Sequence, residues 1–195
     1  MAGAGAYAGS GKLGADGPAL AREGARFRSG ALMCAAGRMG GAEAVRELLA
    51  AGASPKDEGP DGWTALHYAA GHGDCESVGR LLLAGGEPNR LNHSLFGEFT
   101  PLMQVFFGGA YEPLEKTALL LAGGADPSIS GPEGDTALGL LINRGAYCDK
   151  DDNDYKDELE RTARLLQVAG ARLSPAEAAR GPVLPPPRRI TWNSR

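Results

Sequence analysis

The residues best suited to chemistry lie in an acidic segment, residues 148–160, toward the C-terminal end of the chain. Six oxygen-bearing side chains recur there: Asp149, Asp151, Asn153, Tyr155, Asp157 and Glu160. Their spacing is that of the oxygen ligands in a calcium-binding loop between two helices. Two residues depart from that pattern, because Asp154 stands where the loop requires glycine and Lys156 where it needs an apolar anchor. We therefore favour a solvated acidic loop with no metal assigned, and weak calcium binding by residues 149–160 stays open.

A glycine-rich stretch at residues 9–12 is similar to a phosphate-binding loop, but its chemistry is incomplete. Ala6 occupies the position of the first glycine, and Leu13 replaces the hydroxyl residue that would hold magnesium. The three histidines of the chain lack metal-ligand spacing, and no nucleophile with a base beside it emerges. The sequence thus predicts a protein that is not an enzyme and that needs no cofactor.

Charge and cysteine content narrow the partner and the compartment. The formal net charge is −4, and phosphate binding needs a basic face, so nucleic acid is not expected as a partner. No apolar run approaches the roughly 20 residues that span a bilayer, so no membrane contact is expected either. Three cysteines lie far apart and are odd in number, which indicates reduced thiols: Cys34, Cys75 and Cys148. An intracellular, cytoplasmic monomer is predicted, with the nucleus left open.

The elements that would position these residues form a repeat of 34 to 36 residues. One anchor, at which the first helix of each repeat begins, occurs four times: Gly30-Ala31-Leu32-Met33, Thr64-Ala65-Leu66-His67, Thr100-Pro101-Leu102-Met103 and Thr136-Ala137-Leu138-Gly139. A second anchor, a glycine-led turn after the second helix, recurs in the same order: Gly52-Ala53, Gly85-Gly86, Gly124-Ala125 and Gly170-Ala171. The threonine hydroxyl can accept a free backbone N–H at a helix start, and the glycine supplies a left-handed helix stop. Val78, Leu81 and Leu82 form the apolar stripe of a second helix at helical spacing.

The stretch TALHYAA at residues 64–70, with Gly73 and Asn89 at fixed offsets, resembles the ankyrin-repeat family, and residues 61–89 match one nearly complete repeat. The resemblance extends over roughly residues 27 to 173 and implies an all-α solenoid of about four helix-turn-helix repeats with short hairpin fingers between them. It also implies hydrogen bonds from His67 within and between repeats. Asn89 stands at a finger turn, where turn geometry is the favoured role and hydroxylation by a dioxygenase is the alternative.

Three regions are expected along the chain. Residues 1–17 form a flexible Gly/Ala-rich leader, and a short helix over residues 19–28 would lead into the array. Residues 18–173 form the ankyrin-repeat array, with repeats near 27–59, 60–98, 99–132 and 133–173. Residues 174–195 form a short capping helix, which begins with the capping box of Ser174 and Glu177, and a Pro-rich extended tail.

Ankyrin arrays bind protein partners through a concave face made of finger tips and first helices. Carried onto this chain, that face comprises Trp63, Tyr68, His72, Phe99, Gln104, Phe107, Asp135, Asn143 and Arg144. Trp, Tyr and Phe are frequent among the residues that dominate binding energy. The resemblance therefore predicts a non-catalytic interaction module or adaptor with an unnamed protein partner. Two alternatives remain: a calcium-responsive interaction protein that uses the acidic segment, and a regulatory subunit of an enzyme complex.

Overall fold

The computed structural model describes residues 17–59, 61–93, 97–107, 110–147 and 153–180 of the 195-residue chain. This part of the chain forms nine helices: α1 (Gly17–Ala36), α2 (Ala42–Ala50), α3 (Ala65–His72), α4 (Cys75–Leu83), α5 (Pro101–Phe107), α6 (Pro113–Ala122), α7 (Ala137–Tyr147), α8 (Asn153–Val168) and α9 (Pro175–Arg180). The predicted all-α ankyrin-type solenoid is confirmed. The leader, the glycine-rich stretch at residues 9–12 and the Pro-rich tail lie outside the described residues.

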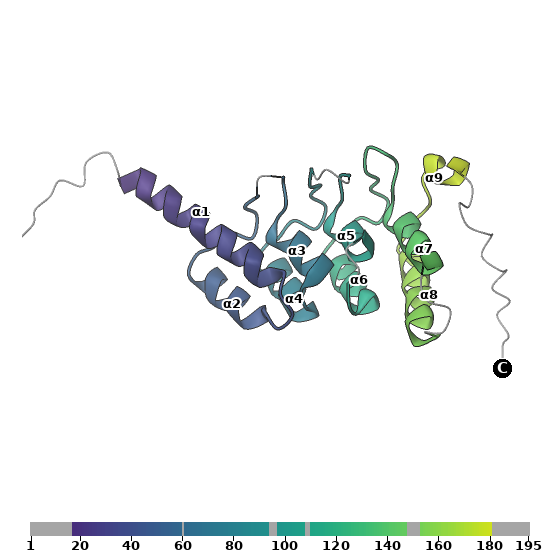
Figure 1. Ribbon diagram of the computed structural model, residues 1–195, viewed down its shortest axis with the longest axis horizontal. Helices are drawn as coiled ribbons and strands as arrows, with labels where there is room; N and C mark the ends of the chain where they lie inside the picture. The colour runs from purple at the N-terminus through teal and green to yellow at the C-terminus, as the bar shows by residue number, and fades with distance from the viewer. Residues whose placement is uncertain (1–16, 60, 94–96, 108–109, 148–152, 181–195) are drawn as a thin grey trace, which may run out of the picture.

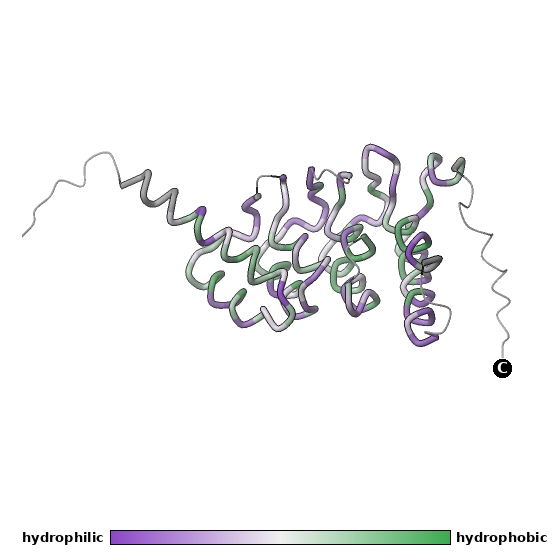
Figure 2. Tube along the Cα trace, viewed as in Figure 1, coloured by the Kyte–Doolittle hydropathy of each residue, from purple (hydrophilic) through white to green (hydrophobic). Residues whose placement is uncertain are grey.

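The helices stack in two layers along the array (Figure 1). The first helices of the repeats, α1, α3, α5 and α7, are neighbours in one layer, and the second helices, α2, α4, α6 and α8, are neighbours in the other. Hairpin fingers project from one side of the stack, and their tips are mostly hydrophilic (Figure 2). No helix among the described residues is long and apolar enough to cross a membrane.

The helices of the second layer end in one repeated way. Gly52, Gly85, Gly124 and Gly170 all adopt positive φ, between 85° and 98°. In each case the next residue donates its N–H to a carbonyl five residues back, as Gly86 does to Leu81 at 2.9 Å. Only glycine adopts this left-handed conformation at little cost, which explains why the same residue recurs at each turn.

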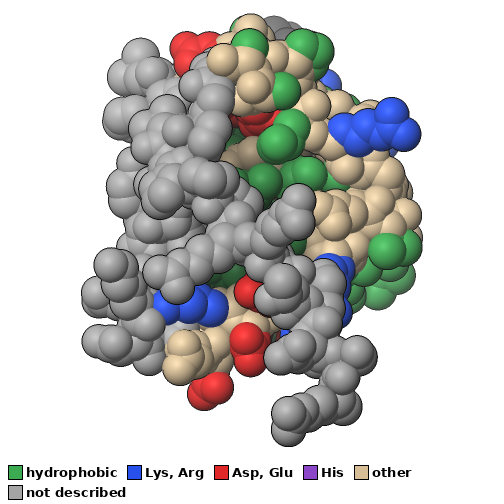
Figure 3. All heavy atoms as spheres, turned by 90° about the vertical axis from the view of Figure 1, so that its right-hand side faces the viewer, with side chains coloured by type: hydrophobic (Ala, Val, Ile, Leu, Met, Phe, Trp, Pro, Cys, Tyr) green, Lys and Arg blue, Asp and Glu red, His purple; other side chains and the backbone are tan. Residues whose placement is uncertain are grey.

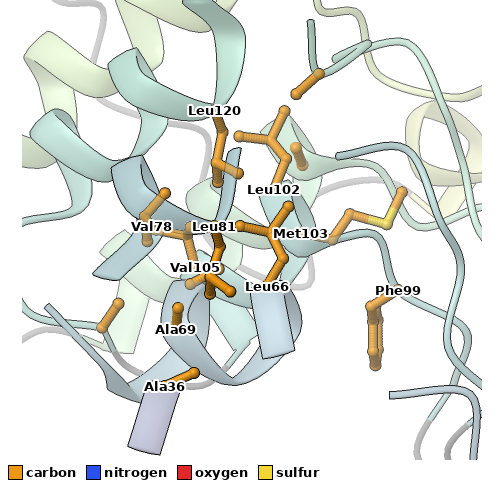
Figure 4. Packing of buried hydrophobic residues seen from close by; sticks show 14 of the residues in the cluster. Ala36, Leu66, Ala69, Val78, Leu81, Phe99, Leu102, Met103, Val105 and Leu120 are labelled. Carbon is orange, nitrogen blue, oxygen red and sulfur yellow. The ribbon is translucent and has the colours of Figure 1, made fainter. Parts of the chain in front are cut away.

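The core runs continuously through the stack. Leu66 of α3, Leu81 of α4 and Leu102 of α5 are each at most 1% exposed and meet between neighbouring repeats (Figure 4). Small residues let the first helices approach closely. A Cβ on Gly73 would lie 2.0 Å from the Ala36 carbonyl oxygen, so close backbone approach, rather than a left-handed turn, requires glycine there.

Both ends of the array differ from the expectation. The helix expected at residues 19–28 and the first helix of the first repeat are one continuous helix, α1, because no residue between them stops a helix. In the fourth repeat, the acidic segment is mostly helical: α8 begins at Asn153 and buries Leu159, Thr162 and Leu166. The predicted acidic loop is therefore wrong for residues 153–160, which lengthen the second helix of that repeat.

Candidate functional site

Trp63 and Tyr68 form an aromatic pair where the hairpin finger between α2 and α3 meets α3. Their ring centroids lie 4.9 Å apart, and both side chains are half-buried. Trp63 also lies 5.9 Å from the ring of His67, while His72, at the end of α3, is exposed. The finger hairpin, closed by a 2.8 Å bond from the Gly59 N–H to the Trp63 carbonyl, sets the position of this pair. These residues thus present aromatic surface on the finger side of the array.

Phe107 and Phe99 form a second pair, in which only one ring is accessible. Phe107 is 46% exposed and stacks on Phe99 at 4.6 Å, whereas Phe99 is 2% exposed. The inclusion of Phe99 in the binding face is therefore wrong, because its ring belongs to the core and supports Phe107 from below.

Gln104 is also buried, contrary to the prediction. Its position in the repeat corresponds to that of Tyr68, but its side chain is only 2% exposed. A Cβ on Gly71 would lie 3.1 Å from Gln104 Cγ, so the glycine in the neighbouring repeat leaves the space that this side chain fills. Positions 68 and 104 are equivalent in the repeat, but only the larger tyrosine at position 68 stays partly exposed.

Arg144 braces the fourth repeat internally. Its Nε donates to the Tyr155 hydroxyl at 2.6 Å, and its Nη1 donates to the Phe106 carbonyl at 3.2 Å. These bonds tie α7 to α8 and to α5, so the half-buried Arg144 already braces the chain itself, and its contact with a partner stays a prediction. Asn143 beside it is exposed, and Asp135 in the finger between α6 and α7 is half-buried.

His67 joins two repeats, as the resemblance implied. Its Nδ1 accepts the backbone N–H of Thr64 at 3.2 Å, and its Nε2 lies 3.1 Å from the Arg90 carbonyl and 3.0 Å from the Phe99 carbonyl. Two carbonyls beside Nε2 require the proton there, so the ring is neutral. Burial lowers the pKa of the His67 imidazole to about 4, against the opposing effect of the two carbonyls.

Asn89 connects the turns of successive repeats. Its amide donates to the Gly124 carbonyl at 3.0 Å and accepts the Asp126 N–H at 2.7 Å. This geometry accounts for an asparagine at the turn, which is the role that we favoured for it.

Lys116 is a buried cation that the sequence analysis missed. Its side chain is fully buried, and Nζ donates to the carbonyls of Gly73 at 2.7 Å and Ala70 at 3.4 Å, where α3 ends. A cation at a helix C-terminus is favourable because the last carbonyls lack partners within the helix. Burial lowers the pKa of the Lys116 ammonium. The residue ties α6 to the preceding repeat and is not accessible for chemistry.

An acidic hollow of about 450 Å³ lies between α6 and α8 on the opposite side from the fingers. Its carboxylates are Glu112, Glu115, Asp154, Asp157 and Glu158. The Cys75 thiol lies close to two of them and donates to the Glu112 carboxylate at 3.2 Å. Burial, followed by the bond to that carboxylate, raises the pKa of Cys75 to about 12. The thiol therefore stays protonated near neutral pH and is no nucleophile or thiolate ligand there.

The calcium-loop pattern does not survive in the described part of the acidic segment. Asn153, Tyr155 and Asp157 are successive alternate positions of α8, and alternate positions of a helix point about 200° apart. Tyr155 instead meets Arg144. Asn153 and Asp157 therefore share one face of α8 and Tyr155 points away from it, so the alternating ligands do not converge as the loop pattern requires.

We expect calorimetric titration of the full chain with calcium at physiological salt to give no saturable heat, because α8 turns Tyr155 away from Asn153 and Asp157 and so breaks the alternating ligand set of the loop. Magnesium under the same conditions is the control. A saturable calcium signal with a matching rise in melting temperature would contradict this expectation.

The comparison with known proteins agrees with this geometry. Residues 32–129, half of the chain, match the family model "Ankyrin repeats (3 copies)". The chain therefore belongs to the ankyrin-repeat family. It is also similar to Protein PhlB of Serratia liquefaciens, with 42% identity over 107 residues. That match covers 54% of this chain and 45% of PhlB, so the chain spans less than half the length of this relative.

Proposed function

We propose that this chain is a non-catalytic protein-binding module whose partner contacts the finger side of the array. The observation that carries the proposal is the half-buried Trp63–Tyr68 pair. His72, four residues beyond Tyr68 on α3, is exposed. Trp63 lies on a finger, and the buried core cluster forms without it. A large aromatic at a site where packing does not demand one is typical of an interface anchor. Family membership supports the general role, since ankyrin repeats serve as interaction modules.

The binding surface that we propose is smaller than the one predicted from sequence. It keeps Trp63, Tyr68, His72, Phe107 and Asn143, which are exposed or half-buried. The finger tips around them are joined to one another by ion pairs, such as that between Arg90 and Glu58, so the face is held in shape before a partner arrives. A preformed face loses less conformational entropy when it binds.

We expect Trp63→Ala to weaken partner binding by about 2 kcal/mol or more, which is about 30-fold in Kd. The partner is first isolated by affinity purification on the full chain and identified, and its affinity for purified variants is then measured. Leu83→Ala is the control, because Leu83 is 92% exposed on α4 in the second-helix layer. Unchanged affinity for Trp63→Ala, with a wild-type melting curve, would remove Trp63 from the interface.

A further inference from the structure

The fourth repeat lacks the side chain that completes the helix start in the second repeat. In the second repeat, the Thr64 N–H donates to His67 Nδ1, three residues along the same helix. The corresponding pair in the fourth repeat is Thr136 and Gly139, and glycine offers no acceptor. The Thr136 N–H would thus be an unpaired donor at the start of α7.

Glu177, 41 residues from Thr136 along the chain, supplies the missing acceptor. Its Oε1 accepts the Thr136 N–H at 2.7 Å, and its Oε2 accepts the Thr136 hydroxyl at 2.8 Å. A Cβ on Gly139 would lie 1.8 Å from Glu177 Oε1, so the carboxylate occupies the space that a side chain at position 139 would take. The absence of that side chain creates a slot, and two donors of Thr136 line it.

Glu177 belongs to α9, which is attached by polar contacts. Ser174 completes a capping box with Glu177 through bonds of 2.9 and 3.1 Å, and its hydroxyl donates to the Gly134 carbonyl in the finger between α6 and α7. None of residues 175–179 is buried, and only Glu177 among them is even half-buried. Release of α9 would therefore expose little apolar surface, which is the main cost of opening a packed element.

The start of α9 takes the place of a further finger. A Cβ on Gly62 in the finger between α2 and α3 would lie 3.1 Å from His93 in the next finger, and a Cβ on Gly134 in the finger between α6 and α7 would lie 2.8 Å from Ala176. The short helix stands at the end of the row of fingers (Figure 1). Viewed from that end, hydrophobic side chains lie in the middle of the surface, with acidic ones above and below (Figure 3). The slot itself lies where the finger between α6 and α7 meets the start of α7.

We propose that Thr136 and Gly139 form a carboxylate-binding slot, that Glu177 occupies it as an internal ligand, and that an acidic side chain of the protein partner replaces Glu177. The replacement rests on the proposed binding function, whereas the slot does not. An internal carboxylate acts at an effective concentration in the millimolar range, so a free carboxylate competes poorly with it. An acidic side chain of a partner that is already bound to the finger side also acts at a high effective concentration, so it can replace Glu177 in the slot.

The slot is tested on the full-length Glu177→Ala variant by the NMR signal of the Thr136 amide. The probe is a synthetic peptide of residues 172–180, and its matched control is the same peptide with Gln at the position of Glu177. We expect millimolar Glu peptide to return the Thr136 signal toward its wild-type position, and the Gln peptide to have at most a third of that effect. No response, or an equal response to both peptides, would overturn the proposal.

The role of Gly139 is tested from the other side of the slot. In full-length Gly139→Ala, the added methyl displaces the carboxylate, so hydrogen exchange of Thr136 and of residues 174–179 is expected to accelerate at least tenfold. Gly79→Ala is the matched control, because a Cβ on this helical glycine meets nothing within 4 Å. Wild-type exchange in Gly139→Ala would overturn the proposal.

Displacement by the partner is tested with the purified partner of the preceding section. Glu177→Ala removes the internal competitor, so partner affinity is expected to rise at least threefold, because a larger fraction of the chain has an open slot. Unchanged affinity would overturn the displacement. Failure of the proposed binding function gives a different result from failure of the slot. In that case Trp63→Ala leaves partner binding intact, while the Glu peptide still shifts the NMR signal of the Thr136 amide.

Discussion

Leu81→Ala is expected to lower the free energy of unfolding by about 3–5 kcal/mol, the range for removing a buried leucine from a packed core. Leu81 is fully buried on α4 and meets Leu66 of α3 and residues of the following repeat, among them Leu120 (Figure 4). Truncation leaves a cavity at the contact between two repeats, and the glycine-stopped end of α4 leaves the backbone little freedom to close it.

Three consecutive leucines offer an internal control for this experiment. Leu82 is half-buried and lies against Gly123, so Leu82→Ala is expected to cost about 1 kcal/mol. Leu83 is 92% exposed, and Leu83→Ala should change the stability by less than about 0.5 kcal/mol. Urea unfolding followed by circular dichroism and by tryptophan fluorescence gives the free energies, and coincident transitions establish two-state behaviour. Equal losses at all three positions would contradict the packing.

The same leucines show how far the sequence could predict the fold. Periodicity and the recurring glycine turns indicate the second helix and its end, because helix stops depend on local backbone conformation. The stripe of Val78, Leu81 and Leu82 was predicted as one apolar face, but the depth of each residue depends on the neighbouring repeats. Leu82 meets Gly123 of the next helix stop, which leaves it half-buried, whereas Leu81 points into the stack.

The errors at the candidate site have a similar cause. Repeat register places Gln104 and Phe99 where Tyr68 and Trp63 stand one repeat earlier, and the backbone does follow the register. The repeat register could not predict whether each side chain is exposed or buried. Gln104 folds into the space left by Gly71, while Phe99 lies under Phe107. Exposure of equivalent positions therefore differs between repeats whenever the neighbour changes size.

Contacts between segments far apart in the chain could not be predicted from local sequence patterns. Lys116 reaches carbonyls 43 and 46 residues away, and Glu177 reaches Thr136 across 41 residues. One sequence feature could have drawn attention to the second contact: Gly139 stands where the second repeat has His67, so no side chain at that position can accept the Thr136 N–H. Among the described residues no ankyrin repeat follows α8, and α9 supplies the bond that a following repeat would make.

Lowering the pH from 7 to 5 is expected to cost about 2 kcal/mol of stability through His67 alone, because the buried ring resists protonation. Its pKa is about 4 in the folded chain and 6.5 in the unfolded chain. Between these values the unfolded chain binds the proton and the folded chain does not, so stability is full above pH 6.5 and falls with pH. The loss approaches about 3 kcal/mol near pH 4 and levels off below it. A proton on Nδ1 would also break the bond from the Thr64 N–H.

The measurement is urea unfolding of the wild type and His67→Gln at pH 7, 6 and 5. Glutamine at this position of a helix start can accept the same backbone N–H without titrating, so the variant should lack about 2 kcal/mol of the wild-type loss. Carboxylates that titrate in this range contribute equally to both proteins and cancel in the difference. His72→Gln makes the same replacement at an exposed position and should follow the wild-type curve. Parallel curves for the wild type and His67→Gln would contradict the role of the buried imidazole in joining the second repeat to the third.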